Sequence, residues 1–529
     1  MTADYIVVGA GSAGSIVAAR LAEAGHRTLL IEAGPPDRNP LIHVPAGVRY
    51  LLNNGKVTWL DQTAPAAAAG GRRIAMPHGK VIGGSGSING MLFVRGLKYD
   101  YDQWAAAGCA GWDFDGVLPY FKSIETYRGG GGEHRGRAGP LSVEDPRLIL
   151  PITRAFVAAA VAAGHRELAD VNLPDNEGVG YSQMNRRGRF RGSSARAFLG
   201  RARRTGNLEI VTDSLVERLL IEDGRCTGVR LGRDGESRDI RTAREVIVAA
   251  GAIGSPQLLQ LSGIGPADHL RAHGIEPIRD LPGVGRNLAD HYGPRVAYRI
   301  DGYRTLNDLS RLPRLGLEVA NWLTAGGGIL TTGVTAAMVF CRSRSIAPAP
   351  DLQLLFAPMS FDANRYGVLE RTPGCSVTVS ASRPKSRGSV MIDSPDPSAR
   401  PVIDSNYLSH PDDVQTLLAG IGLTRDIFRR SPLAEHVALE TLPGIEADEA
   451  AMVEYTRKAG ATLYHPVGTC RMGSGDDAVV DPQLRVRGIS GLRVADASIM
   501  PIISSGNTNA PTMMIGEKAA SLILERERG

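Results

Sequence analysis

His465 is a candidate proton acceptor in the C-terminal part of this 529-residue chain. It stands in the segment Leu-Tyr-His-Pro-Val-Gly-Thr over 463–469, where Pro466 fixes φ and removes a backbone N–H group. The unperturbed pKa of an imidazole is near ~6.5, so a neutral histidine can take a hydroxyl proton at physiological pH. For a histidine taken alone, the more common role is that of a core side chain satisfied by hydrogen bonds.

Asn507 is a second polar candidate, at the end of the segment Ser-Ser-Gly-Asn. Its amide can donate to and accept from a hydroxyl group, but it cannot take up a proton near neutral pH. A structural role is open as well, because asparagine is a favoured N-cap and a helix is predicted from 510 to about 525. Both roles can hold together, since the segment leads into that helix.

The N-terminal segment over 4–34 has the pattern of a nucleotide-binding strand–helix–strand unit. Apolar β-formers over 5–8 and 28–31 predict two buried strands of a parallel sheet, and residues 15–24 predict a helix between them. Glycines therefore fall where the first strand turns into the helix. The order of these elements distinguishes the segment from an ordinary glycine-rich turn.

Gly9, Gly11 and Gly14 occupy the positions of a Gly-x-Gly-x-x-Gly motif. A backbone without side chains lets a pyrophosphate approach the free N–H groups at the helix N-terminus. Glu32 closes the second strand, where an acidic side chain accepts hydrogen bonds from an adenosine ribose. The motif predicts a dinucleotide site and does not by itself separate NAD from FAD.

Residues 79–90 form a second glycine-rich segment, Gly-Lys-Val-Ile-Gly-Gly-Ser-Gly-Ser-Ile-Asn-Gly. Such a composition disfavours helix and strand, and it lets backbone N–H groups crowd around a ligand. A flexible surface loop is the alternative. Val81, Ile82 and Ile88 favour the ligand-binding interpretation, because they would anchor the loop in a core.

The overall composition is that of an ordinary globular protein with two or more domains. Hydrophobic residues make up 43% and charged residues 22%, and a net charge of +5 gives no indication of a nucleic-acid partner. Two arginine-rich runs, over 186–191 and 196–204, are interpreted as solvated faces or phosphate-reaching surface rather than as a nucleic-acid groove binder. No apolar stretch approaches the ~18 residues that a membrane-spanning helix needs.

Cysteine and histidine spacing favours neither a disulfide framework nor a metal site. An odd number of cysteines without Cys-x-x-Cys spacing predicts reduced thiols, and with no signal peptide before the first strand we expect a cytoplasmic protein. His269 and His273 stand four residues apart, but no third ligand is evident. The chain has no Gly-x-Ser-x-Gly elbow, so a serine hydrolase is not supported. The cysteines are Cys109, Cys226, Cys341, Cys375 and Cys470.

Several segments resemble the glucose-methanol-choline (GMC) oxidoreductases. Residues 79–102 resemble the first signature of this family, and residues 251–265 resemble the second. The segment 281–291, Leu-Pro-Gly-Val-Gly-Arg-Asn-Leu-Ala-Asp-His, and the stretch over 464–512 are also similar to the family. Together with the N-terminal motif, the resemblance covers essentially the whole chain.

The resemblance implies an α/β fold in which an FAD-binding Rossmann-like domain is interrupted by an inserted α+β substrate domain built on an antiparallel sheet. The FAD-binding blocks are expected over 1–150, 201–293 and 461–529, and the substrate blocks over 151–200 and 294–460. Short strands predicted over 208–212, 216–221, 227–231 and 245–250 fit the first domain. Segments over 351–357, 376–382 and 389–392 are predicted to form one antiparallel sheet that faces the flavin.

The resemblance also implies which residues contact FAD and which do the chemistry. His465 matches the catalytic histidine of the family, and Asn507 matches a second active-site position that is His or Asn. The last helix would begin at the flavin pyrimidine, where its positive end favours negative charge on the reduced ring. The matching cofactor-binding positions are Gly9, Gly11, Ser12, Ala13, Gly14, Glu32, Ala33, Gly79, Gly83, Gly84, Ser85, Asn89, Gly90, Met91, Val216, Asp496, Ala497, Asn507, Thr508 and Asn509.

The activity implied by the resemblance is oxidation of an alcohol to an aldehyde by hydride transfer to flavin N5. His465 would take the hydroxyl proton, Asn507 would orient the oxygen, and the electrons would pass to oxygen or a quinone-like acceptor. Aromatic residues are only 5% of the chain and form no evident cage for a quaternary ammonium, so we expect a neutral primary alcohol, preferably aromatic or heteroaromatic, rather than choline.

Other activities within the same family remain open. One is a choline or sugar dehydrogenase, and another is an FAD-containing hydroxynitrile lyase that works without redox turnover. Some family members bind FAD covalently through a histidine of the first signature. The matching residue here is Ile88, which has no nucleophile, so non-covalent FAD is expected.

Overall fold

The structure of the chain is a computed structural model that describes residues 3–233, 235–362, 368–444 and 448–526. A parallel sheet with the strand order β10-β2-β1-β13-β26 holds together segments from both ends of the chain. Its strands are apolar and buried in the middle of the sheet, as expected where helices cover both faces. The strands are β1 (Ala3–Val8), β2 (Thr28–Ile31), β10 (Leu208–Val211), β13 (Glu236–Val248) and β26 (Leu492–Val494).

The long strand β13 joins this parallel sheet to an antiparallel extension. Its first half pairs antiparallel with β12 (Arg225–Arg233), which pairs in turn with β11 (Leu215–Glu222). Its second half pairs parallel with β1 and β26. The predicted strand covers only this second half, because the first half is largely exposed and carries no apolar run.

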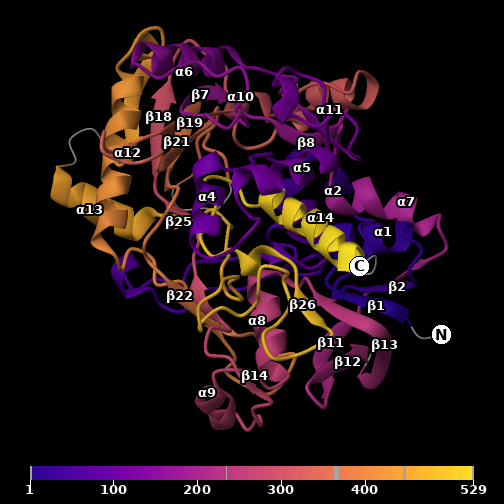
Figure 1. Ribbon diagram of the computed structural model, residues 1–529. Helices are drawn as coiled ribbons and strands as arrows, with labels where there is room; N and C mark the ends of the chain where they lie inside the picture. Colours follow the sequence, from indigo (N-terminus) through magenta and orange to yellow (C-terminus); the bar gives the residue numbers. More distant parts are fainter. Residues whose placement is uncertain (1–2, 234, 363–367, 445–447, 527–529) are drawn as a thin grey trace.

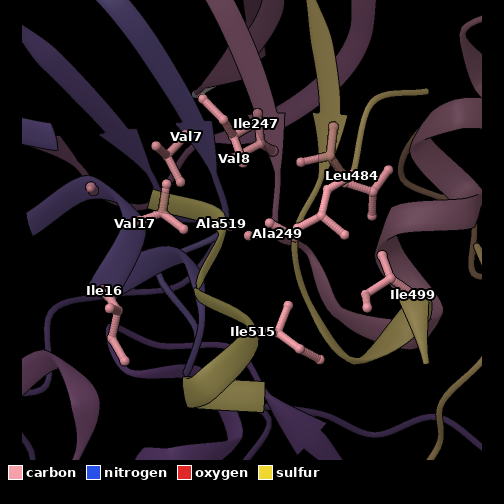
Figure 2. Close-up of a cluster of buried hydrophobic side chains, with 14 of the residues drawn as sticks. Val7, Val8, Ile16, Val17, Ile247, Ala249, Leu484, Ile499, Ile515 and Ala519 are labelled. Atoms are coloured by element: carbon pink, nitrogen blue, oxygen red, sulfur yellow. The ribbon is translucent and has the colours of Figure 1, made fainter. Parts of the chain in front are cut away.

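Two helices from opposite ends of the chain pack on one face of the parallel sheet. Helix α1 (Gly14–Glu23) lies beside α14 (Asn509–Arg526), drawn in indigo and yellow in Figure 1. Figure 2 shows part of the core that they share with the sheet, in which Val17 of α1 and Ile515 of α14 belong to one buried cluster with Val7 and Ile247. The N-terminal strand–helix–strand prediction is therefore confirmed.

The substrate side of the molecule is a six-stranded antiparallel sheet with the order β24-β18-β21-β20-β19-β7. One face packs against α6 (Pro151–Ala162) and α12 (Pro411–Phe428), in the upper part of Figure 1. The predicted α/β class with an antiparallel second sheet is thus confirmed. The strands are β7 (Gly178–Tyr181), β18 (Arg295–Ile300), β19 (Ala337–Cys341), β20 (Leu352–Ala357), β21 (Gly374–Ala381) and β24 (Val437–Leu442).

The prediction that residues 389–392 belong to this sheet is wrong. Strand β22 (Gly388–Met391) pairs with β16 (Arg286–Leu288) and β23 (Val402–Asp404) in a separate sheet. The connection after β21 is held on α12, because the carboxylate of Asp413 accepts hydrogen bonds from the backbone N–H groups of Lys385 and Ser386. This anchor carries the chain away from the larger sheet.

The interpretation of residues 186–191 as a solvated face is also wrong for two of the arginines. The guanidinium of Arg186 is buried and donates to the carbonyl oxygens of Thr331 and Asp145. That of Arg191 is buried as well and donates to the carbonyl of Ile42 and to Asn89. Backbone carbonyls accept from both guanidinium groups, and Arg186 also forms an ion pair with Glu144. A charge count along the sequence does not reveal such partners.

Smaller elements connect the two sheets. The pair β17 (Tyr292–Gly293) and β25 (Ala461–Thr462) is antiparallel and lies between them. None of the helices within the described ranges has the length and apolar character needed to cross a bilayer. The remaining larger elements are α4 (Lys98–Ala106), α5 (Phe114–Ile124), α8 (Gly251–Leu261), α9 (Ala267–Ala272), α11 (Arg314–Thr324), α13 (Glu449–Ala459), β5 (Glu125–Tyr127), β6 (Leu141–Glu144), β8 (Met184–Arg187) and β9 (Phe190–Arg191).

Candidate active site

A cavity of about 960 Å³ runs from the carboxyl ends of β1 and β2 to the exposed face of the antiparallel sheet. Ligands of open α/β sheets bind at the carboxyl ends of the parallel strands, so its position is that of a cofactor site. At one end lies Glu32, and at the other lie His465 and Asn507. The cavity therefore joins the predicted nucleotide site to the predicted catalytic residues.

The first glycine loop forms a close-packed cradle at one end of the cavity. Gly9 has φ +97°, and a Cβ there would stand 2.5 Å from the carbonyl oxygen of Ala249. A Cβ on Gly14 would stand 1.9 Å from the carbonyl oxygen of Gly9, so only glycine lets α1 pack so close to the loop. At Gly11 the nearest atom to such a Cβ is 4.0 Å away, and the space above it is the cavity itself.

The second glycine loop lies directly over the first. Gly84 has φ +53°, and a Cβ there would stand 2.7 Å from the Cα of Gly11. The loop is held from below by the buried Arg191, which donates to the carbonyl and side-chain oxygens of Asn89. The interpretation of residues 79–90 as an anchored loop is confirmed, since Val81, Ile82 and Ile88 are all buried.

Glu32 ends β2 with its carboxylate in the cavity wall. The carboxylate accepts hydrogen bonds from the backbone N–H groups of Ala10 and Gly34, at 2.9 Å each. Burial nevertheless raises the pKa of Glu32 to about 7, because desolvation outweighs these two bonds. An acidic group in this position can accept from a ribose hydroxyl.

Asp496 also lines the cavity, but its carboxylate is occupied by the protein. It accepts from the N–H group of Gly251 at 2.8 Å, from the hydroxyl of Ser255 at 2.5 Å and from the N–H group of Ser498 at 2.8 Å. The side chain of Asp496 therefore has a structural role, and its contact with FAD stays a prediction.

The start of α14 closes the cavity between the glycine loops and His465. Ser12 donates to the Oδ1 atom of Asn509 at 2.7 Å and ties the first glycine loop to this helix. The Nδ2 atom of Asn509 and the Oδ1 atom of Asn507 are buried and have no hydrogen-bond partner among the described residues. Buried polar atoms are nearly always paired, so these two atoms mark a polar ligand site at the positive end of the helix.

His465 is positioned by the short β17–β25 pair. The N–H group of Leu463 donates to the carbonyl of His291 at 2.8 Å, which fixes the spacing between the two segments. The backbone N–H of His465 donates to the Oδ1 atom of Asp290, also at 2.8 Å. The His465 ring is 7% exposed and faces the cavity lining.

Burial favours the neutral imidazole of His465, whose Nε2 atom accepts a hydrogen bond from Asn507 in this structure. The Nδ2 atom of Asn507 lies 3.0 Å from the Nε2 atom of His465, and because an amide NH₂ can only donate, Nε2 carries the lone pair. Burial, together with the neighbouring His291, lowers the pKa of His465 well below its usual value. The N-cap role considered for Asn507 is wrong, since its Oδ1 atom accepts no hydrogen bond within the described part of the chain.

Most predicted site residues lie together in one cavity wall. Gly14 and Gly83 do not line it: Gly14 packs α1 against the first loop, and Gly83, with φ +90°, shapes the second. Among the residues described, no group of three potential metal ligands lies together. The lining residues are His465, Asn507, Gly9, Gly11, Ser12, Ala13, Glu32, Ala33, Gly79, Gly84, Ser85, Asn89, Gly90, Met91, Val216, Asp496, Ala497, Thr508 and Asn509.

The sequence-based prediction gave no role to two groups that contact the site residues. His291 contacts His465, and Gly251, with φ +81°, lines the cavity and donates to Asp496. The family resemblance could have pointed to both residues, because they lie in the segments 281–291 and 251–265 that resemble the family. Spacing along the chain could not bring His291 to His465, since the pairing of β17 with β25 makes that contact.

Comparison with known proteins places this arrangement in a family. Models of the N- and C-terminal parts of the GMC oxidoreductases match residues 3–293 and 384–516, and the chain belongs to this family. It is an FAD-dependent oxidoreductase that acts on CH–OH groups.

Similar proteins cover nearly the whole chain. Oxygen-dependent choline dehydrogenases from Rhizobium etli and Vibrio vulnificus are 41% and 40% identical, with 100% and 99% of this chain and 96% and 94% of those proteins covered. The crystal structure of pyridoxine 4-oxidase from Mesorbium loti is 32% identical with a TM-score of 0.90, over 99% of both chains. Formate oxidase from Aspergillus oryzae is 28% identical with a TM-score of 0.93, over 99% of this chain and 98% of that chain.

The residues present fit an FAD molecule. At Gly9 and Gly84 the two loops pack so closely against neighbouring backbone that no side chain fits. Above Gly11 the cavity is open, so a ligand can approach the backbone there. The unpartnered Nδ2 atom of Asn509, a donor, and the unpartnered Oδ1 atom of Asn507, an acceptor, stand at the N-terminus of α14, where a polar ring that both accepts and donates hydrogen bonds would pair with them. The dinucleotide would lie between Glu32 and His465.

Asn507 provides a first testable prediction. In Asn507→Asp, a carboxylate would replace the amide donor 3.0 Å from Nε2 and would favour a protonated, cationic His465. We expect slower flavin reduction by alcohol at neutral pH and partial recovery at higher pH, where His465 loses the proton. Asn507→Ala should slow reduction about 10- to 100-fold without this recovery, since only a hydrogen bond to a reacting group is lost.

Stopped-flow reduction of the flavin between pH 6 and 9 measures both variants. A profile of Asn507→Asp that is parallel to that of Asn507→Ala would contradict the assigned donor role of the amide.

Proposed function

We propose that this protein oxidises a neutral primary alcohol to an aldehyde, with His465 as the base and Asn507 as the group that orients the alcohol oxygen. The observation that carries the proposal is the pair itself: the Nε2 atom of His465 and the amide of Asn507 lie 3.0 Å apart in the wall of the cofactor cavity. FAD supplies the hydride acceptor when bound. The substrate hydroxyl would replace the Asn507 Nδ2 donor at the Nε2 lone pair of His465 and give its proton to Nε2, and the substrate would leave as the carbonyl compound.

The apolar and neutral side chains of the cavity lining favour an uncharged substrate. Leu92 and Leu355 pack together in one apolar cluster with Leu463, two residues before His465. Strand alternation turns Ser376 and Thr378 of β21 toward the cavity, and their neutral hydroxyl groups can accept or donate without charge.

A positive charge in the cavity lining disfavours choline. The guanidinium of Arg295 lies 4.5 Å from the ring centroid of Phe361, so this aromatic face already holds a cation. Arg295 and Phe361 both line the cavity, and a quaternary ammonium there would meet a like charge. Choline nevertheless stays the second candidate, because the relatives named above are choline dehydrogenases.

A panel of alcohols tests the substrate class. We expect kcat/KM for benzyl alcohol or a pyridine methanol to exceed that for choline at least tenfold, since like-charge repulsion and a missing cation site weaken choline binding. Pyridoxine is included because of the similar pyridoxine 4-oxidase structure. A higher kcat/KM for choline than for every neutral alcohol would overturn the proposed substrate and leave the class of enzyme intact.

The pH dependence of flavin reduction tests the state of His465. Because burial lowers its pKa well below the usual value near ~6.5, the neutral base predominates at pH 7. Protonation should remove activity only as the pH falls below about 6.5, and the rate at saturating alcohol should be flat from pH 8 to that point. If the rate of flavin reduction in stopped-flow measurements falls with decreasing pH around a midpoint above pH 7, His465 is not the neutral base assigned here at that pH.

Several finer features follow from the same proposal. We expect the blocks 1–150, 201–293 and 461–529 to hold FAD non-covalently, because Ile88 offers no nucleophile, and the blocks 151–200 and 294–460 to hold the substrate. Oxygen or a quinone-like molecule would accept the electrons. The five buried, unpaired cysteines are in keeping with a reducing, cytoplasmic location.

A further inference from the structure

We propose that His291 is a positioning residue that holds His465 in the tautomer whose Nε2 atom accepts the substrate proton. The inference rests on the proposed function in one respect, namely that His465 is the base. It assigns a task to a second buried histidine that touches His465 and does not line the cavity.

The two histidines form a fixed pair. Their Nδ1 atoms lie 2.9 Å apart, and their rings are perpendicular, with centroids 5.1 Å apart. His291 immediately precedes β17 and His465 follows β25, so the antiparallel pairing of these strands sets the distance between them. His291 is completely buried and His465 nearly so.

A backbone carbonyl decides which nitrogens carry protons. The Nε2 atom of His291 lies 2.9 Å from the carbonyl oxygen of Ser382, and a carbonyl can only accept, so this nitrogen bears the hydrogen. The Nδ1 atom of a neutral His291 is then unprotonated and accepts from the Nδ1–H group of His465. The Nε2 atom of His465 is left with its lone pair, and the amide of Asn507 donates to it.

The same chain of bonds serves the protonated state of His465. When Nε2 takes the hydroxyl proton, the resulting imidazolium still donates from Nδ1 to the neutral ring of His291. The proton cannot pass farther, because the other nitrogen of His291 already donates to Ser382. Burial lowers the pKa of His291 to about 4, which keeps this partner neutral.

The other groups packed against the pair do not replace this contact. Asp290 accepts from the backbone N–H of His465, from Thr462 and from the hydroxyl of Tyr407, so its carboxylate holds the backbone and not the ring. Burial raises the pKa of Asp290 to about 6 and that of Tyr407 well above its usual value. Within the described residues, His291 is therefore the partner of the His465 Nδ1 atom.

Two substitutions separate positioning from packing. In His291→Asn the Oδ1 atom can stand near the place of Nδ1 and accept from His465, whereas His291→Leu fills a similar volume without an acceptor. We expect both variants to bind FAD and alcohol with dissociation constants within about threefold of the parent. The rate constant for flavin reduction should fall about 10- to 100-fold in His291→Leu, as for loss of a hydrogen bond to a charged group, and His291→Asn should be at least tenfold faster than His291→Leu.

A ¹⁵N NMR spectrum of the histidine side chains reports the tautomer of His465 without turnover. In the oxidised holoenzyme labelled with ¹⁵N-histidine, the resonances absent from His465→Gln identify His465. We expect a protonated Nδ1 and an unprotonated Nε2 in the parent and in His291→Asn, and loss of this single tautomer in His291→Leu.

The outcomes are distinguishable from failure of the proposed function. A parent His465 protonated on Nε2, or equal reduction rates for both His291 variants, would overturn the positioning role. If no alcohol reduces the flavin, the proposed function fails, and the nitrogen spectrum still tests the tautomer. If His291→Leu does not fold, the ¹⁵N NMR spectra of the parent and of His291→Asn still test the proposal, because both should show His465 protonated on Nδ1.

Discussion

His465→Gln is expected to slow reduction of the flavin by alcohol about 10²- to 10⁴-fold, the range that positioned general acid–base groups contribute. Glutamine keeps a polar side chain of similar reach but cannot take up a proton near neutral pH. The proposed FAD site lies mainly on the glycine loops and the start of α14, so we expect the variant to bind the cofactor. The measurement is anaerobic stopped-flow reduction at saturating alcohol, with FAD content checked by absorbance.

A second histidine serves as the matched control. His273 follows α9 outside the cavity wall and contacts the carbonyl of His269, so His273→Gln should reduce at the parent rate. A His465→Gln variant that loses less than about tenfold while it binds FAD normally would show that another group accepts the proton.

Gly11→Ala is expected to weaken FAD binding strongly while the apoprotein folds normally. A Cβ at this position meets no protein atom closer than 4.0 Å, so the fold tolerates it, but it projects into the space where a pyrophosphate would approach the backbone. Overpacking costs about 1–3 kcal/mol, which corresponds to roughly a 5- to 150-fold higher dissociation constant. Titration of the apoprotein with FAD, followed by flavin fluorescence, measures it.

The control for Gly11→Ala is a glycine with free space outside the site. A Cβ on Gly200, at the start of the short helix after residue 199, meets nothing within 4 Å, and this residue does not line the cavity. Gly200→Ala should bind FAD like the parent. If Gly11→Ala binds FAD as tightly as the parent, the pyrophosphate does not lie over Gly11, and the glycine-loop site is contradicted.

The local elements of the cofactor site could be predicted from the sequence because each is encoded by a short run. The strand, glycine turn and helix over 4–24 are consecutive, and the observed β1 and α1 differ from the prediction by one or two residues at their ends. The first half of β13 was missed, since its exposed residues have no apolar pattern and are held by their pairing with β12.

Long-range contacts account for the parts that could not be predicted. The pattern of β22 is that of a strand, but its choice of partner depends on Asp413, which holds the preceding segment on α12. Arg186 and Arg191 are buried because backbone carbonyls from distant segments receive their hydrogen bonds. His291 contacts His465 only through the pairing of β17 with β25.

The central claim, that alcohol is oxidised at His465 with FAD as acceptor, is tested most directly by mixing the purified holoenzyme anaerobically with neutral primary alcohols while the flavin absorbance is followed. We expect at least one aromatic or heteroaromatic alcohol to bleach the flavin in the parent and to leave it unbleached on the same timescale in His465→Gln. Admission of air would then distinguish an oxidase from a dehydrogenase by the speed at which the colour returns. A holoenzyme that no alcohol bleaches, and that releases cyanide from a cyanohydrin, would contradict the account and indicate a lyase.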